Sequence, residues 1–435
     1  MDLTSRLRSI VRGGPPKREL TYEPDIGGYE AVMDIERVGE ILGGLPVETP
    51  FGKCLVIDRR FESDRFHGEV RIGDCEVTES EGLSILDPGL PSAERRAPSP
   101  GPRRTIFIDL ETTGLSGGAG TVPFLVGCGY FDLGAFQVRQ FLLTSFASER
   151  ALLCAVAEFF AGADLIVTYN GKTFDVPLME TRWLFHRIQM PLDGVPHFDM
   201  LHPARRLWKG RADANLEGGC RLSTLERTLF GVTRVGDVPG LEIPGRYFRF
   251  LRSGDPRPLE PVLEHNRYDL VSLAAVMARG VQLAREGHAS CRDCAEALAL
   301  GKVFERVDLN ERAEACYRHA ADVDDVEVRG EALYRLGLRL RRERRFGEAA
   351  AVWRDVLRLT EPRHVRRRLG ELRQFATEAL AIHHEHRDGD LTTARELALF
   401  ALQETDAFAA EGIRHRLARL DRKLAKKRDA QLFTS

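Results

Sequence analysis

The spacing of apolar residues changes once along this chain, near Gly287, and this change sets the expected architecture. Upstream, short apolar runs that are typical of buried strands alternate with helical patterns, as in TIFIDL (105–110) and LIVTY (165–169). Downstream, every pattern is helical. Because 435 residues also exceed what one hydrophobic core usually supports, we expect an α/β domain followed by an all-α domain.

The order of the predicted elements in the α/β part indicates a mixed sheet. Segments 124–132 and 136–143 predict an antiparallel pair of strands joined by a turn at Leu133–Gly134. A helix is expected over Glu149–Ala161, and the last helix of the domain around Leu259–Arg279. Strands in succession, followed by helices that alternate with further strands, are typical of a mixed sheet flanked by helices.

The segment boundaries follow from composition. We expect residues 1–30 to be a flexible tail, and residues 31–100 to contain a small β-rich element and a Pro-rich linker. The α/β domain is predicted at 101–283 and the helical domain at 288–426.

Two acidic residues lie at the end of the first strand of the α/β domain. In IFIDLETTGL (106–115), Asp109 and Glu111 are two positions apart, so they point to the same face of an extended strand. Their apolar neighbours indicate burial, and a divalent cation can offset the repulsion between two buried carboxylates. The alternative is that the strand ends at Leu110 and both carboxylates are solvated.

Two further acidic residues stand in patterns that are weak by themselves. In VTYNGKTFDVPLM (167–179), Asp175 is predicted to open a helix after a strand, where it can equally serve as a helix N-cap. In HNRYDLVSL (265–273), His265 and Asp269 are four positions apart on one helix face, which is also an ordinary surface pair.

The order of these pieces is more informative than any one of them. The chain resembles the DEDD exonucleases, which are ribonuclease H-like enzymes. The resemblance lies in three motifs in order: a strand Asp-x-Glu, an Asp after a strand and an Asn, and a helical Asp with an imidazole one turn before it. The phrases GGAGT (117–121), CRLSTLERTLFG (220–231) and VPGLEIPGRYF (238–248) make the region 104–282 similar to the YprB-like branch. The resemblance implies a ribonuclease H-like fold, and it carries over four carboxylates: Asp109, Glu111, Asp175 and Asp269.

The resemblance also implies a chemistry, namely a 3′→5′ exonuclease with a two-metal mechanism. The four carboxylates would hold two divalent cations, and Mg²⁺ or Mn²⁺ is expected for an all-oxygen ligand set. The cations would activate a water and stabilise the leaving 3′-oxygen. We expect His265 to orient or deprotonate that water. It stands four positions before Asp269, where one branch of these enzymes has a tyrosine; the other has its histidine five positions before.

Residues beside the acidic motifs are candidate substrate contacts. Thr112 follows Glu111 directly, and Asn170 and Lys172 lie in the loop before Asp175. For that loop, a polar turn with a solvated lysine is an equal alternative. The expected substrate is a nucleic acid, and the sequence leaves DNA and RNA open because it contains no recognisable module that reads bases or 2′-hydroxyls.

The helical part contains a degenerate internal repeat. ERAEACYRHA (311–320) and FGEAAAVWRDVL (346–357) match at an offset of 36 residues, and LTTARELALFAL (391–402) is a looser copy. The pattern resembles tetratricopeptide repeats, whose usual period is about 34 residues; a plain helical bundle is the alternative. Such repeats would bind a protein partner or shape the path of the substrate.

Composition indicates the cellular setting. The formal net charge of −2 neither favours nor excludes a nucleic-acid binder, and no apolar run approaches the ~20 residues that span a bilayer. The 8 cysteines form no regular framework, so we expect reduced thiols, a cytoplasmic location and no membrane association. Cys291 and Cys294 form one CxxC without a matching second pair, which favours two thiols over a zinc or redox site.

Two functions stay open at this point. One is a metal-dependent nuclease whose helical domain contacts a partner or the substrate. The other is a non-catalytic module that binds nucleic acid through the ribonuclease H-like fold and a protein partner through the repeats. All four acidic positions are occupied, which favours the nuclease, because a retired active site has no physical need for four converging carboxylates.

Overall fold

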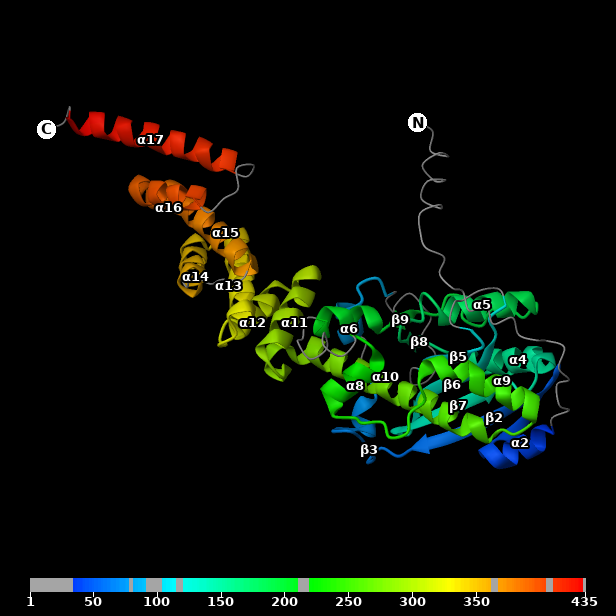
Figure 1. Cartoon of the computed structure of the whole chain (residues 1–435). Helices are drawn as coiled ribbons and strands as arrows, with labels where there is room; N and C mark the ends of the chain where they lie inside the picture. Colours follow the sequence, from blue (N-terminus) through cyan, green and yellow to red (C-terminus); the bar gives the residue numbers. More distant parts are fainter. Residues whose placement is uncertain are drawn as a thin grey trace, which may run out of the picture.

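The computed structural model describes residues 34–77, 81–90, 104–114, 120–209, 219–360, 367–403 and 410–432. An α/β domain with a mixed sheet is followed by helices only, and Figure 1 shows these helices extending from the sheet as an arm. The predicted fold class is therefore confirmed. The N-terminal tail and most of the Pro-rich linker lie outside the described residues.

A mixed sheet of seven strands forms the centre of the α/β domain as described, in the order β1-β2-β7-β6-β5-β8-β9. The central strand β5 (Thr105–Thr112) pairs antiparallel with β6 (Pro123–Asp132) and parallel with β8 (Leu165–Thr168). The other strands are β1 (Leu45–Thr49), β2 (Gly52–Phe61), β7 (Ala135–Leu142) and β9 (His197–Asp199). The predicted antiparallel pair is β6 and β7, and the turn residues between them both have positive φ.

The β-rich segment before residue 100 joins this sheet. Strand β2 pairs antiparallel with β7, with Leu55 opposite Leu142, and β1 pairs with β2 at the edge. The segment also contains α2 (Ile35–Leu42), the small β3–β4 sheet (Phe66–His67 and Val70–Arg71), η1 (Ile72–Cys75) and α3 (Glu81–Leu86). These strands therefore extend the sheet that carries the acidic motif.

Helices cover both faces of the sheet because successive residues of a buried strand point to opposite sides. Phe107 of β5 belongs to the core that contains residues of α6 (Leu201–Trp208), α8 (Leu222–Phe230) and α10 (Glu260–Glu286). Ile106 and Ile108 belong to a second core, which contains residues of α4 (Glu149–Phe160), α5 (Asp175–Phe185) and α9 (Ile243–Ser253). Asp109 and Glu111 share the parity of Phe107 and so face α10.

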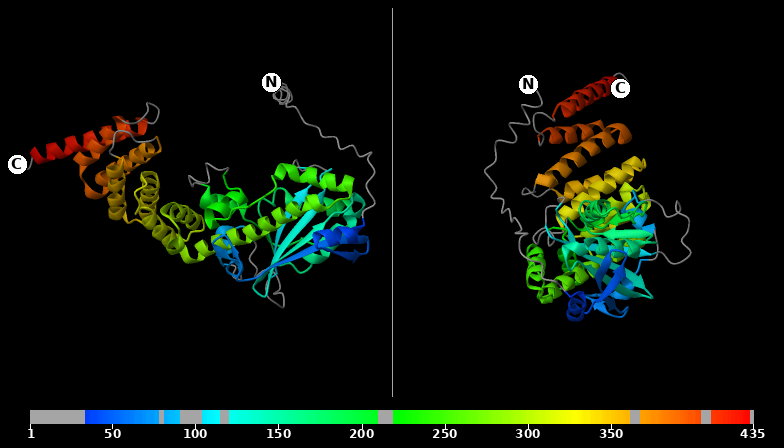
Figure 2. Two further views of the ribbon diagram at one scale, coloured as in Figure 1. Left: turned by 60° about the horizontal axis from the view of Figure 1, so that its bottom comes forward. Right: turned by 90° about the vertical axis from the view of Figure 1, so that its right-hand side faces the viewer.

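Past η6 (Gly287–Ser290), the described chain is helical, and Figure 2 shows its helices following an arc. Successive helices pack in pairs, and the residues that the internal repeat aligns, Ala313 with Ala349 and Tyr317 with Trp353, are buried. The tetratricopeptide assignment stays a prediction. The helices are α11 (Cys294–Arg306), α12 (Asn310–Ala320), α13 (Val326–Arg342), α14 (Phe346–Leu359), α15 (Arg367–His383), α16 (Leu391–Gln403) and α17 (Ala410–Leu432). Among the described helices, none combines the length and the apolar character needed to cross a bilayer.

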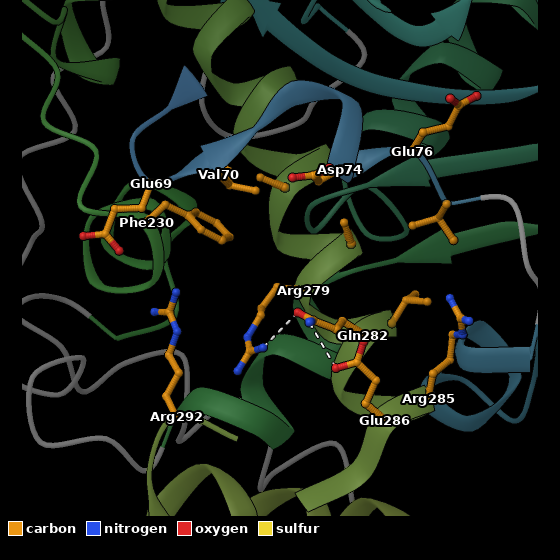
Figure 3. A pocket seen from close by; sticks show the side chains of 14 residues that line it. Glu69, Val70, Asp74, Glu76, Phe230, Arg279, Gln282, Arg285, Glu286 and Arg292 are labelled. Carbon is orange, nitrogen blue, oxygen red and sulfur yellow. Dashed lines mark hydrogen bonds between the residues drawn. The ribbon is translucent and has the colours of Figure 1, made fainter. Parts of the chain in front are cut away.

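The arm and the α/β domain share one hydrophobic core. Trp208 of α6 lies in the same cluster as Phe304 of α11, and the Trp208 indole donates a 2.8 Å hydrogen bond to Glu296. Glu296 also accepts a 2.7 Å hydrogen bond from Arg279 of α10. Arg279 and Gln282 line a hollow of about 500 Å³ beside this junction, and the lining includes none of the four predicted acidic residues (Figure 3).

Candidate active site

Strand β5 places the first two carboxylates. It runs past both Asp109 and Glu111 to Thr112, and Asp109 lies in register opposite Gly127 of β6. The register between β5 and β6 shifts after Glu111, where the strand approaches its end. Both carboxylates are therefore held on a central strand, facing α10.

Asn266 of α10 fixes the first of these carboxylates. Its Nδ2 donates to Oδ2 of Asp109 at 2.7 Å and to the Asp109 carbonyl oxygen at 3.1 Å. Its Oδ1 accepts a 2.8 Å hydrogen bond from Gln140, and the residue is fully buried. Close approach of the helix requires Gly127, because a Cβ there would lie 2.1 Å from the Asn266 Oδ1. Asn266 was not predicted from the sequence, although it follows His265 directly.

Asp175 is the first residue of α5, as predicted, and it is buried. The loop before it turns through Asn170, whose φ is +70°. The buried carboxylate of Asp199 holds this loop, because it accepts hydrogen bonds from the backbone N–H groups of Asn170 (2.8 Å) and Lys172 (3.0 Å). Asp199 also accepts a 3.1 Å hydrogen bond from the N–H of Leu201, so the same carboxylate connects this loop to the start of α6.

Helix α10 carries His265 and Asp269 on one face, as their spacing predicts. The Nε2 atom of His265 lies 3.5 Å from Oδ2 of Asp269, and its Nδ1 lies 2.6 Å from Oδ1 of Asp237. Asp237, in the loop before α9, was not predicted. The available signal was its position directly before the VPGLEIPGRYF phrase. The imidazole thus lies between two carboxylates.

The four predicted carboxylates lie close enough to repel one another. Burial raises the pKa of Asp109 well above its usual range, and repulsion from the other three carboxylates raises it further. Burial likewise raises the pKa of Glu111, with repulsion from Asp269, Asp175 and Asp237 next in size. Burial also raises the pKa of Asp175 to about 7, with a further contribution from Asp199. The chain therefore concentrates negative charge where it is poorly solvated.

A set of carboxylate oxygens is the donor type that Mg²⁺ and Mn²⁺ prefer. As placed, no three His, Cys, Asp or Glu side chains of the described residues converge closely enough to ligate one ion. Arg234 donates to Oδ1 of Asp269 at 2.5 Å, and Asn266 holds one oxygen of Asp109. The site fits the cations by donor chemistry and by charge, and ligation would require these two carboxylates to share their oxygens with the ion.

The three predicted substrate contacts are engaged within the protein. The Thr112 hydroxyl donates to the Gly114 carbonyl oxygen at 2.8 Å, and Thr112 is 7% exposed. Lys172 lies 3.1 Å from the carboxylate of Asp87, and the Asn170 side chain accepts a hydrogen bond from Thr173. Their contact with substrate stays a prediction.

The CxxC cysteines lie at the start of the arm. Both Cys291 and Cys294 are free thiols, and their sulfur atoms contact backbone carbonyl oxygens, of Gly287 for the first and of His319 and Asp322 for the second. No metal-binding group that includes them occurs in the described parts of the chain.

Comparison with known proteins gives three similarities. Residues 106–280 match the RNase_H superfamily. The chain is 30% identical over 377 residues to protein YprB of Bacillus subtilis (strain 168), an alignment that covers 85% of this chain and 86% of YprB. A family B DNA polymerase from the hyperthermophilic archaeon Pyrobaculum calidifontis matches 49% of this chain with 14% identity and a TM-score of 0.32. This chain covers 30% of the polymerase, and so distant a likeness carries no argument about function.

Proposed function

Because the chain belongs to the YprB family within the RNase_H superfamily, we propose that it is a metal-dependent nuclease acting on nucleic acid. We further propose that it removes nucleotides in the 3′→5′ direction. Membership of a superfamily whose enzymes generally hydrolyse phosphodiester bonds supports the reaction class. The observation that supports the assignment most is the placement of four acidic side chains on β5, α5 and α10, close enough to raise the pKa values of Asp109 and Glu111.

In this proposal, Asp109, Glu111, Asp175 and Asp269 would hold two Mg²⁺ or Mn²⁺ ions. When bound, such ions lower the pKa of a water and neutralise charge that develops on the phosphate. Asn266 keeps the Asp109 carboxylate oriented through its 2.7 Å hydrogen bond.

His265 is the proposed acceptor of the proton from the attacking water. Its Nδ1 donates to Asp237 at 2.6 Å, which leaves Nε2 as the unprotonated nitrogen, on the side of Asp269. A neutral imidazole can take up that proton through its free ring nitrogen. Asp237 orients the ring.

The direct test is a cleavage assay with Mn²⁺ and with chelator. We expect Asp109→Asn and Asp175→Asn to lower kcat by about two orders of magnitude or more, because each removes a charged ligand. His265→Ala should lower kcat roughly 100-fold, through loss of the proton acceptor. The exposed Asp132, at the end of β6, supplies a control: Asp132→Asn should cut at the wild-type rate. Cleavage that survives chelator or either acidic-site variant contradicts the mechanism.

The substrate is identified in the same assay with 3′- and 5′-labelled strands. Single- and double-stranded DNA and RNA ends should be compared, and stepwise loss from the 3′ end is expected for one of them. Tight binding of an end by wild-type protein with Mn²⁺, without any cleavage, would instead support the non-catalytic binding module.

A further inference from the structure

A buried arginine contacts one of the four carboxylates. The Arg234 side chain is 6% exposed, and its Nε and Nη2 donate to the two carboxylate oxygens of Glu226 at 2.7 and 2.8 Å. The same Nη2 donates to Oδ1 of Asp269 at 2.5 Å. The guanidinium carbon also lies 5.6 Å from the ring centroid of Tyr268. The planar group is therefore held in one orientation where it meets Asp269.

Glu226 is itself held by the buried Ser272, which in turn bonds to the buried His67. Its carboxylate, on a side chain that is 2% exposed, accepts a hydrogen bond from the hydroxyl of Ser272 on α10. The fully buried Ser272 hydroxyl lies 2.8 Å from Nε2 of His67 in β3. Because the hydroxyl gives its one proton to Glu226, His67 Nε2 is the donor to Ser272. A continuous chain of hydrogen bonds thus runs from β3 to Asp269.

The charges along this series of hydrogen bonds allow it to hold Asp269 in place. Glu226 neutralises Arg234, so the pair can hold Asp269 without cancelling its negative charge. Only Oδ1 of Asp269 bonds to Arg234, and Oδ2 lies on the side of His265. A cation can therefore still be attracted to this carboxylate, whose rotation the arginine restricts.

We propose that Arg234 is a positioning residue, which fixes the Asp269 carboxylate for cation binding and phosphodiester hydrolysis, and that Glu226, Ser272 and His67 hold it there. This inference rests on the proposed nuclease function. It gives the segment around β3 a part in the site, although β3 lies outside the region that matches the superfamily.

The test uses the full chain with Glu226 and Arg234 changed together. The double variant Glu226→Gln/Arg234→Gln leaves the net charge unchanged. It removes the guanidinium group that bonds to Asp269 and the carboxylate that holds this group. We expect the Mn²⁺ dissociation constant, measured by calorimetry, to rise about tenfold, and kcat to fall about tenfold or more. The KM for nucleic acid should stay within about twofold, because the pair touches a metal ligand and not the substrate. A folded double variant with wild-type Mn²⁺ affinity and kcat overturns the inference.

A matched control comes from a second buried pair. Arg279 and Glu296 are 10% and 0% exposed at their side chains and lie 2.7 Å apart, and they belong to the junction with the arm (Figure 3 shows Arg279). Arg279→Gln/Glu296→Gln should lower the melting temperature and leave Mn²⁺ affinity and kcat unchanged. Equal losses of affinity and kcat in both double variants would point to general destabilisation and overturn the inference.

Arg234→Lys keeps the test decisive if the double variant does not fold. Lysine retains the charge but has one nitrogen and no planar fork, so we expect weaker Mn²⁺ binding and lower kcat. Wild-type values for both overturn the inference. If wild-type protein neither binds Mn²⁺ nor cuts any nucleic acid, the proposed function itself fails. If it does both and Arg234→Lys matches it, only the role of Arg234 fails.

Discussion

Carboxylates gathered in one poorly solvated place destabilise a fold unless protons or cations offset their charge. Here, Asn266 and Arg234 each donate to one of the four carboxylates, and the pKa values of Asp109, Glu111 and Asp175 are raised. A bound cation would relieve this repulsion. The metal-free protein should therefore respond to pH in a characteristic way.

The response can be predicted for Asp175, whose pKa rises from 3.8 to about 7. Because the pKa is higher in the folded than in the unfolded chain, the contribution of Asp175 to the free energy of unfolding is fully present below about pH 4. This contribution is lost as the pH rises through about 7. At pH 8 without cations, the loss from this residue is roughly 4 kcal/mol, since one pKa unit corresponds to about 1.4 kcal/mol. We expect Asp175→Asn to melt at a higher temperature than wild type at pH 8, and the difference to shrink toward pH 4.

Thermal melts in chelator from pH 4 to 8 check this prediction. Adding Mn²⁺ at pH 8 should stabilise wild type more than Asp175→Asn, because the ion replaces the proton. Parallel pH profiles of the two proteins would contradict the assigned cause.

The sequence predicted the acidic residues at this scale because their signals are local. A strand period of two places Asp109 and Glu111 on one face, and a helix turn does the same for His265 and Asp269. Asn266, Asp237 and Arg234 carry no such signal. Their importance comes from partners far along the chain, such as Asp109 for Asn266, which are 157 positions apart.

Between elements, the decisive contact is the close crossing of α10 over β6. Gly127 allows it, because the Asn266 side-chain amide occupies the space of a Cβ. The β-rich segment also depends on distant contacts, and from the sequence it was predicted only as a small element within residues 31–100. Its strand β2 pairs with β7, and no local periodicity can predict a partner about 80 positions away.

Gly127→Ala tests this crossing. The added methyl would displace Asn266 and with it the Asp109 carboxylate, so we expect kcat to fall at least about tenfold and the fold to lose about 1–3 kcal/mol, as for an overpacked core. Gly162 is the control for backbone strain alone. It has a positive φ, and a Cβ added there would meet no atom within 4 Å. Gly162→Ala should lower the melting temperature without lowering kcat. Full activity in Gly127→Ala would remove Asn266 from the mechanism.

At the scale of the whole molecule, the arm contributes to the stability of the sheet domain. Trp208 is fully buried, and α11 packs on the helix that carries it. A chain ended after Glu286 would expose this side chain, at a cost of about 3 kcal/mol for Trp208 alone. We expect the truncated chain to melt several degrees below the full chain. Equal melting temperatures would mean that the two parts fold independently.

The sequence predicted the change from α/β to all-α structure, and the structure buries the residues that its repeat aligns. It gave no indication that Trp208, Glu296 and Arg279 join the two parts. Each of these residues has an ordinary local context, and the junction arises only when three separate helices meet.

A joint of this kind has a geometric consequence. The Trp208 indole and the Arg279 guanidinium both donate to Glu296 of α11. A rotation of the first helices of the arm relative to the sheet would therefore break a buried ion pair. A protein bound farther along the arm would therefore keep a fixed distance and orientation relative to the four carboxylates.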